Sequence, residues 1–344
     1  MRQIVLFFIL FPTIIYSQNN YSFASKKAFK KAQSEMELNH FDAANLLFKA
    51  VVKDEPTFSE AYLNMSIIEY SKKDFQKSLD LSQLALDNNK VQHAIYTQVG
   101  KSFFMLNNYD SSAYYFQLAN LYGANTANDY YNLAKSENNL KNFSSALVNI
   151  EKAIEKDNKI ADYFVVKGNS NLGSFNYDAA KNDYNKALEL NPNQSNLYAN
   201  LAKVNIETGN SEAALANIKK GLDSADGNEK IAFLLLQGNY LKSNNEIDKA
   251  ESSFNKAFEI DNNNASVLIN QSAIMIKKGD YEKAVEKCTE AIEIDGVMHE
   301  AYFNRGIAYE MLKNTEDACS DWEVAFIMGS VKAEEFINSP TCNE

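Results

Sequence analysis

Proline and glycine are scarce in this chain, whose 344 residues include only 4 Pro and 12 Gly. Both residues interrupt helices, so their scarcity favours long helices joined by short turns. Histidine and cysteine are rarer still, with three residues of each. The histidines, His40, His93 and His299, lie far apart, and the chain has no H-E-x-x-H, G-x-S-x-G, P-loop or G-x-G-x-x-G motif. The sequence therefore predicts no catalytic residues, no metal site and no cofactor, in a protein that is not an enzyme.

Positive charge is also in short supply, because 34 Lys and Arg face 45 Asp and Glu, for a formal net charge of −11. An acidic chain is repelled by phosphate backbones and anionic lipids, which disfavours nucleic acid and membrane surfaces as the main partners. The apolar fraction of 45% is normal for a folded protein and argues against wholesale disorder.

Long apolar runs are missing, with one exception at the N-terminus. After Arg2, residues 4–15 are apolar apart from Pro12 and Thr13, and small Ser17 precedes a polar segment. This run is too short to span a bilayer and is typical of a secretory signal. The sequence predicts a signal peptide over residues 1–17, a short segment over 18–24, and an exported mature protein, periplasmic or secreted, without stable membrane insertion. The alternative is an uncleaved membrane anchor.

One phrase recurs throughout the rest of the chain. A bulky residue is followed by Ala or Ser, then by a large residue and another Ala, as in Tyr177, Ala180, Tyr184 and Ala187. The Ala or Ser anchors repeat every 34 residues, apart from one step of 36 residues. They lie at Ala44, Ser78, Ser112, Ala146, Ala180, Ala214, Ala250, Ala284 and Ala318, with the copies at Ser78 and Ala214 being weaker.

An earlier segment of each repeat carries a second small residue, with a bulky residue four positions before it. Side chains four apart share one face of a helix, so each repeat predicts two helices that approach closely at the small residues. Turns between them are indicated by Asn107-Asn108, Gly209-Asn210, Asn244-Asn245 and Gly279-Asp280, which tolerate left-handed backbone. The small residues of the first helices are Gly100, Ala134, Gly168, Ala202, Gly238 and Gly306.

A 34-residue period with these residues resembles the tetratricopeptide repeat. The resemblance implies an all-α fold, a right-handed α-solenoid of about nine helix-turn-helix hairpins over residues 25–332. We expect the two extra residues of the long step, near Glu229-Lys230, in a loop between repeats. Val331 to Ile337 are predicted to form a short capping helix, so residues 333–344 hold the end of this helix and the tail. The repeats lie near 25–58, 59–92, 93–126, 127–160, 161–194, 195–228, 231–264, 265–298 and 299–332.

The resemblance also implies where a partner would bind, because in this family the first helix of each hairpin lines a concave groove. The residue two before each small residue should point into this groove. Six of the eight residues at this position are carboxamides, which can hydrogen-bond an extended peptide backbone. The pattern resembles the asparagine ladder of O-linked N-acetylglucosamine transferases; the alternative is that these residues serve packing and solvation. The series is Asn64, Gln98, Asn132, Val166, Asn200, Leu236, Asn270 and Asn304.

A second groove position, one residue after the small residue, holds Lys101, Lys135 and Lys203. Members of the family that clamp a terminal carboxylate use Lys and Asn at such positions. Lys101 with Asn132 and Lys135 is the nearest approach to that arrangement in this chain. The alternative is that these lysines are simply solvated.

The three cysteines have separate expected roles. Cys288 takes the large-residue position of a second helix, which predicts a buried small hydrophobe. Cys319 lies in the last full repeat and Cys342 in the tail, and in an exported protein a disulfide between them can pin the capping helix. Two free thiols are the alternative.

The leading functional hypothesis is therefore a protein-protein interaction scaffold that binds a peptide segment of a partner outside the cytoplasm. A structural component of an envelope assembly, built by self-packing of the solenoid, is the alternative. An enzyme that escapes motif recognition is the least favoured.

Overall fold

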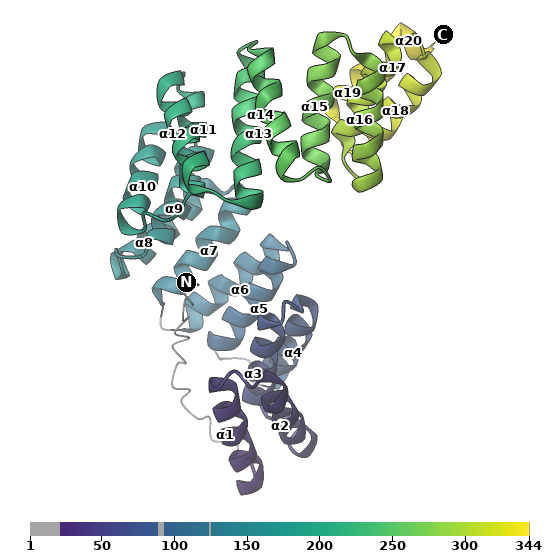
Figure 1. Ribbon diagram of the computed structural model, residues 1–344. Helices are drawn as coiled ribbons and strands as arrows, with labels where there is room; N and C mark the ends of the chain where they lie inside the picture. Colours follow the sequence, from purple (N-terminus) through teal and green to yellow (C-terminus); the bar gives the residue numbers. More distant parts are fainter. Residues whose placement is uncertain (1–20, 89–92, 124, 344) are drawn as a thin grey trace. The chain divides into compact units, whose positions relative to one another are not determined.

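The computed structural model describes residues 21–88, 93–123 and 125–343 of the chain. All regular structure in these residues is helical, which confirms the predicted all-α class (Figure 1). The predicted signal peptide, residues 1–17, lies outside the described residues. Consecutive helices pack as hairpins, and the chain divides into two compact units, residues 1–158 and 159–344.

The first unit contains four hairpins among its described residues. They are α1 (Phe23–Glu37) with α2 (Phe41–Asp54), α3 (Ser59–Ser71) with α4 (Phe75–Asn88), α5 (His93–Met105) with α6 (Tyr109–Tyr122), and α7 (Ala127–Asn139) with α8 (Phe143–Lys156).

The second unit contains five hairpins and two terminal helices. The hairpins are α9 (Ala161–Gly173) with α10 (Tyr177–Leu190), α11 (Asn196–Glu207) with α12 (Ser211–Ser224), α13 (Gly227–Ser243) with α14 (Ile247–Ile260), α15 (Ala265–Lys278) with α16 (Tyr281–Ile294), and α17 (His299–Met311) with α18 (Thr315–Ile327). The terminal helices are α19 (Val331–Ile337), which confirms the predicted capping helix, and α20 (Pro340–Asn343).

Small residues of the first helices allow the two helices of a hairpin to pack closely. In four hairpins an aromatic side chain of the second helix lies over a glycine of the first helix, 16 residues earlier in the chain. A Cβ added to Gly168 would lie 2.6 Å from the Tyr184 ring, and one added to Gly306 would lie 2.5 Å from Trp322. Because real Cβ atoms do not approach other atoms so closely, only glycine fits beneath these rings.

The two residues of this contact complement each other in size. Glycine lies beneath the aromatic rings of Phe116, Tyr184, Phe254 and Trp322. Where the second helix carries a smaller residue, the first helix carries a larger one. The pairs of this kind are Ala134 with Ile150, Ala202 with Ile218, Ser66 with Ser82, and Ser272 with Cys288, while Ala32 with Phe48 in the first hairpin departs from the rule.

Cys288 follows from this rule. Its side chain is fully buried and within hydrogen-bonding reach of Ser272, and burial raises the pKa of its thiol to about 11. The prediction of a buried small hydrophobe is therefore confirmed.

The turns inside the hairpins share one backbone conformation. In each turn a single residue has positive φ, and these residues recur in the same register as the anchors. Asn107, Gly209, Asn245 and Gly279 are of types that tolerate this conformation. Asn39 is of the same type, and the others are Lys73, Lys141, Phe175 and Lys313. Lys and Phe are not typical of residues with positive φ, so the sequence did not predict this turn conformation at their positions.

The two extra residues of the 36-residue step lie in a helix, and the expectation of a loop was wrong. Helix α13 begins at Gly227 and is 17 residues long. Glu229 lies in the first turn of this helix, where its negative charge interacts favourably with the helix dipole. Its carboxylate also accepts a hydrogen bond from Ser195 at the start of α11. The insertion therefore extends α13 toward its N-terminus.

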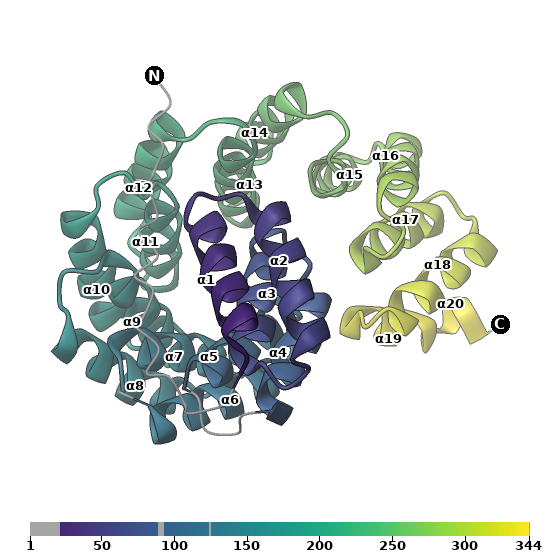
Figure 2. The same ribbon diagram turned by 90° about the horizontal axis from the view of Figure 1, so that it is seen from below.

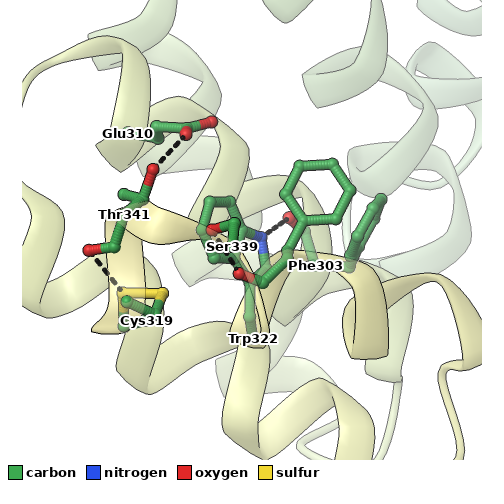
Figure 3. Close-up of a disulfide and its surroundings, with 8 residues drawn as sticks. Phe303, Glu310, Cys319, Trp322, Ser339 and Thr341 are labelled. Atoms are coloured by element: carbon green, nitrogen blue, oxygen red, sulfur yellow. Dashed lines mark hydrogen bonds between the residues drawn. A yellow bond between two sulfur atoms is a disulfide. The ribbon is translucent and has the colours of Figure 1, made fainter. Parts of the chain in front are cut away.

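The C-terminal end of the second unit is closed by α19 and α20. The Phe336 ring of α19 lies 4.7 Å from the Trp322 ring and 5.2 Å from the Phe303 ring, measured between centroids. A disulfide joins Cys319 of α18 to Cys342 of α20, with the two Cα atoms 5.6 Å apart (Figure 3). Thr341 next to it donates a 3.4 Å hydrogen bond to Glu310 of α17. The cap is thus tied to both helices of the last hairpin.

The size rule predicts a specific rescue. Gly238→Ala should destabilise the second unit by about 2 kcal/mol, because the new methyl group overlaps the Phe254 ring. Adding Phe254→Ile recreates the natural pair of Ala202 and Ile218, so the double variant should lose about 1 kcal/mol less than the sum of the single variants. Urea denaturation followed by circular dichroism measures all three. Additive losses would contradict the rule.

The turn conformation predicts a gain in stability. Lys73 and Lys141 are exposed and have φ of 65° and 61°, where a side chain with a Cβ is strained. Changing both to Gly should raise the free energy of unfolding of the first unit by about 1 kcal/mol. Gly209→Ala, at φ 72°, should lower that of the second unit by about 1 kcal/mol. A lower thermal midpoint for the double Lys-to-Gly variant, or a higher one for Gly209→Ala, would refute the explanation.

Candidate functional site

The expected ladder of carboxamides does not extend along the first unit. Asn64 is 4% exposed and donates to the backbone oxygen of Glu60 at 2.8 Å. Gln98 is 5% exposed and donates to Ser78 Oγ at 3.1 Å. Asn64 is therefore bonded within α3 and Gln98 to α4, and because both side chains are buried, the expectation that they face a ligand was wrong.

A row of buried serine hydroxyls explains why Gln98 turns inward. Ser78 Oγ lies 3.1 Å from Ser66 Oγ and 2.9 Å from Ser102 Oγ, linking α4 to α3 and α5. Gln98 joins this row because a buried hydroxyl oxygen attracts its amide N–H. Ser112 and Ser136 repeat the arrangement at 2.8 Å between α6 and α7. The two serine anchors of the first unit, Ser78 and Ser112, are thus hydrogen-bonded contacts.

Lys101, Asn132 and Lys135 stay together on α5 and α7. Burial lowers the pKa of Lys101, and the Asp129 charge opposes this shift. The Lys135 ammonium lies over two rings, 4.6 Å from Phe104 and 5.3 Å from Tyr131. Asn132 Nδ2 is buried without a hydrogen-bond partner among the described residues. All three residues are half-buried, and they do not line the cavity described below.

Asp129 links α5 to α7 beside this group. Its carboxylate is 1% exposed and contacts His93 Nε2 at 2.7 Å and Thr97 Oγ1 at 3.0 Å, and it also accepts a hydrogen bond from Thr126. Burial alone would raise its pKa, but the hydrogen bonds from His93, Thr126 and Thr97 outweigh burial and lower it. The carboxylate is therefore charged and stabilising at neutral pH.

The second unit has a cavity of about 640 Å³ that contains the last two members of the predicted ladder, Asn270 and Asn304. Its lining residues come from α15 and α17 with the residue before α17, from the end of α13, and from the α18–α19 turn with the start of α19. Figure 2 shows α17, α18 and α19 beside one another at this end of the chain. Its lining combines apolar Ile269, Met298, Phe303 and Val331 with polar Lys242, Ser266, His299, Glu300, Ser330 and Lys332.

The two carboxamides of the cavity are held differently. Asn270 donates to Ser266 O at 2.9 Å and accepts from the Lys242 ammonium at 3.2 Å, so its orientation is fixed. Asn304 Nδ2 makes only long contacts, at 3.4 Å to Ile269 O and 3.3 Å to Ser272 Oγ. Long contacts are weak, so a ligand can replace them at little cost.

Lys242 is the least solvated cation of the cavity. Its pKa is lowered by burial first and then by the charges of Lys277 and Lys332. Its ammonium lies 5.7 Å from the Phe254 ring, which supplies a weak compensating attraction. Sequence reasoning missed Lys242 and Lys332, because neither occupies a position at which a ligand contact was expected.

The remaining predicted groove residues lie outside the cavity. Asn200 is half-buried and Lys203 exposed on α11. Across the described residues, no group of three or more His, Cys, Asp or Glu side chains could hold a metal ion. No helix in the described part of the chain combines the length and the apolar character needed to cross a bilayer.

Comparisons with known proteins identify the repeats. Tetratricopeptide repeat models match residues 29–93, 171–237 and 231–264, which confirms that the chain carries tetratricopeptide repeats. No curated protein matches the chain.

Solved structures similar to the chain have low sequence identity. A tetratricopeptide repeat protein from Parabacteroides merdae has a TM-score of 0.59 at 17% identity, covering 73% of this chain and 99% of that one. PilW, a widely conserved type IV pilus biogenesis factor, has a TM-score of 0.53 at 16% identity, covering 59% and 94%. YrrB, a TPR protein with an unusual peptide-binding site, has a TM-score of 0.46 at 18% identity, covering 54% and 96%. At such identities the first two likenesses show the fold alone.

The Asp129 contacts predict a pH-dependent loss of stability. Because the pKa of Asp129 is lowered in the folded state, its stabilisation is complete above the unfolded-state pKa, near 4, and is lost as pH falls through the folded value. Asp129→Asn should cost about 2 kcal/mol at pH 7, because charged hydrogen bonds are lost in a buried place. In urea denaturation from pH 7 to pH 3, the difference between the wild type and this variant should shrink below pH 4. A constant difference would contradict the assignment.

Proposed function

We propose that this protein is an interaction scaffold that holds a segment of a partner protein in the cavity of the second unit. The observation that carries the proposal is the lining of this cavity. Apolar side chains surround two carboxamides, and ligand sites commonly combine an apolar wall with a few polar groups that fix orientation. The volume of about 640 Å³ lies within the range of ligand sites.

The two carboxamides suit a peptide backbone. Asn304 can donate through Nδ2 and accept through Oδ1, which matches the alternating groups of an extended chain. Asn270 lies one repeat earlier and is held by Ser266 and Lys242. Because the Asn270 side chain is already held in place, it loses little conformational entropy when the ligand binds. Phe303 and Ile269 of the same cavity lining together offer an apolar contact for a ligand side chain.

The protein is proposed to act outside the cytoplasm. The apolar run after Arg2 supports export. The bond between Cys319 and Cys342 supports the same location, because structural disulfides persist in oxidising compartments.

The proposal predicts that Asn304 and Asn270 are required for peptide binding. Octapeptides that bind the wild-type protein would be selected from a displayed random library and synthesised with a fluorescein label. Each labelled peptide would then be titrated with the protein, and binding would be followed by fluorescence anisotropy. Asn270→Ala with Asn304→Ala should weaken binding about tenfold or more, because two hydrogen bonds to the ligand are removed.

The matched control is Asn193→Ala, which removes an exposed carboxamide of the same unit outside the cavity. It should bind like the wild type, and circular dichroism should report unchanged helix content in both variants. Equal affinity of the double variant and the wild type would exclude this cavity as the site.

A further inference from the structure

Two lysines from different parts of the fold line the same cavity. Lys242 comes from the end of α13, and Lys332 comes from α19, which lies outside the repeats. Lys277, near the end of α15, adds a third positive charge that acts on Lys242. Like charges repel, so gathering them at one place is unfavourable unless a negative group joins them. This gathering occurs in a chain whose net charge is −11.

The cavity supplies little negative charge of its own to these amines. The Lys242 ammonium contacts Asn270 Oδ1 and the Phe254 ring, and among the described residues no carboxylate pairs with it. Glu300 also lines the cavity, but its carboxylate lies 3.6 Å from His299 Nδ1. A half-buried ammonium held only by neutral groups lacks the anion that would compensate for its lost hydration.

We propose that the cavity selects a carboxylate group of its ligand, bound between Lys242 and Lys332, so that the cap helix α19 forms part of the binding site. The proposal rests on the proposed function and adds the chemistry that the ligand must carry. The carboxylate can belong to an acidic side chain or to the C-terminus of a peptide. Asn270, which is hydrogen-bonded to Lys242, and Ser330, two residues before Lys332, supply neutral hydrogen-bonding groups for the same anion.

The position of Lys332 depends on how the cap is held. Gly329, with φ 97°, turns the chain between α18 and α19, and Ser330 N donates to Ala325 O at 2.9 Å. Ala333, next to Lys332, is fully buried, and Phe336 packs on Trp322. A helix of seven residues is too short to persist alone in water, so α19 depends on these contacts.

The disulfide reinforces this arrangement beyond the C-terminal end of α19. Cys342 belongs to α20, which follows α19 after two residues, and its bond to Cys319 ties the chain end to α18 (Figure 3). With both ends of the cap fixed to α18, Lys332 stays at the cavity. The disulfide therefore contributes to ligand affinity through the position of Lys332.

Three fluorescein-labelled pools of octapeptides with otherwise random sequences test the proposal on the full chain. The first pool has Asp and Glu at three positions and an amidated C-terminus. The second has only neutral residues and a free C-terminal carboxylate, and the third has neutral residues and an amidated C-terminus. At least one carboxylate pool should bind about tenfold more tightly than the neutral pool. Which pool binds more tightly identifies the source of the carboxylate.

The outcomes separate the two proposals. Equal binding of all three pools overturns carboxylate selection but leaves peptide binding intact. No binding of any pool overturns the proposed function and carboxylate selection together.

Variants then locate the carboxylate. Lys242→Gln should weaken the preferred pool about tenfold, and Lys332→Gln, at a more exposed residue, about threefold. Glu300→Gln should strengthen the same pool about threefold, because it removes a competing negative charge. Lys283→Gln is the matched control, because Lys283 is exposed on α16 and does not line the cavity. Loss of affinity in Lys283→Gln alone would overturn the assignment to this cavity.

The role of the cap is tested by a double-mutant cycle. Cys319→Ser with Cys342→Ser should weaken the preferred pool about as much as Lys332→Gln does, and adding Lys332→Gln should cause little further loss. Affinity for the neutral pool reports whether the rest of the cavity is intact. If Lys332→Gln has its full effect without the disulfide, or no effect with it, the participation of the cap is refuted.

Discussion

The fold depends on one contact, in which a large side chain of the second helix of a hairpin covers a small residue of the first. Glycine beneath Phe116, Tyr184, Phe254 and Trp322 lets the two helices approach until the ring lies on the backbone. Close packing makes the contact sensitive to single methyl groups, so an alanine in place of the glycine favours a side chain smaller than an aromatic ring. The pairs Ala134 with Ile150 and Ala202 with Ile218 follow this rule, whereas Ala32 with Phe48 departs from it. The hairpins repeat because this contact repeats.

This contact also determines which features of the fold could be predicted from the sequence. A buried pair restricts residue types in most repeats, so the register and the hairpins were predictable. The turns were only partly predictable, because Lys141 and Phe175 adopt positive φ at a place imposed by the packed helices on either side. The division into two units after residue 158 was not predictable, because the 34-residue register continues through it.

Of the four cavity side chains to which a ligand contact is assigned, two were predictable and two, Lys242 and Lys332, were not. Asn270 and Asn304 were found because they share a position in the repeat, yet Asn64 and Gln98 share it too and are buried. The difference comes from a neighbouring residue, since Ser78 offers Gln98 a hydroxyl partner that depends on the preceding hairpin. Lys332 escaped prediction for another reason. It lies beyond the last repeat, where no period assigns it a direction.

The cap of a repeat array must cover the last apolar face. Here Phe336 and Ala333 cover Trp322 and its neighbours, while Val331 and Lys332 of the same helix line the cavity. One helix therefore has a packing face and a face toward the cavity. A helix of seven residues does not persist alone in water, so the bond from Cys342 to Cys319 stabilises the packing face and, through it, the face toward the cavity. Stability of the chain end and chemistry of the site are in this way parts of the same arrangement.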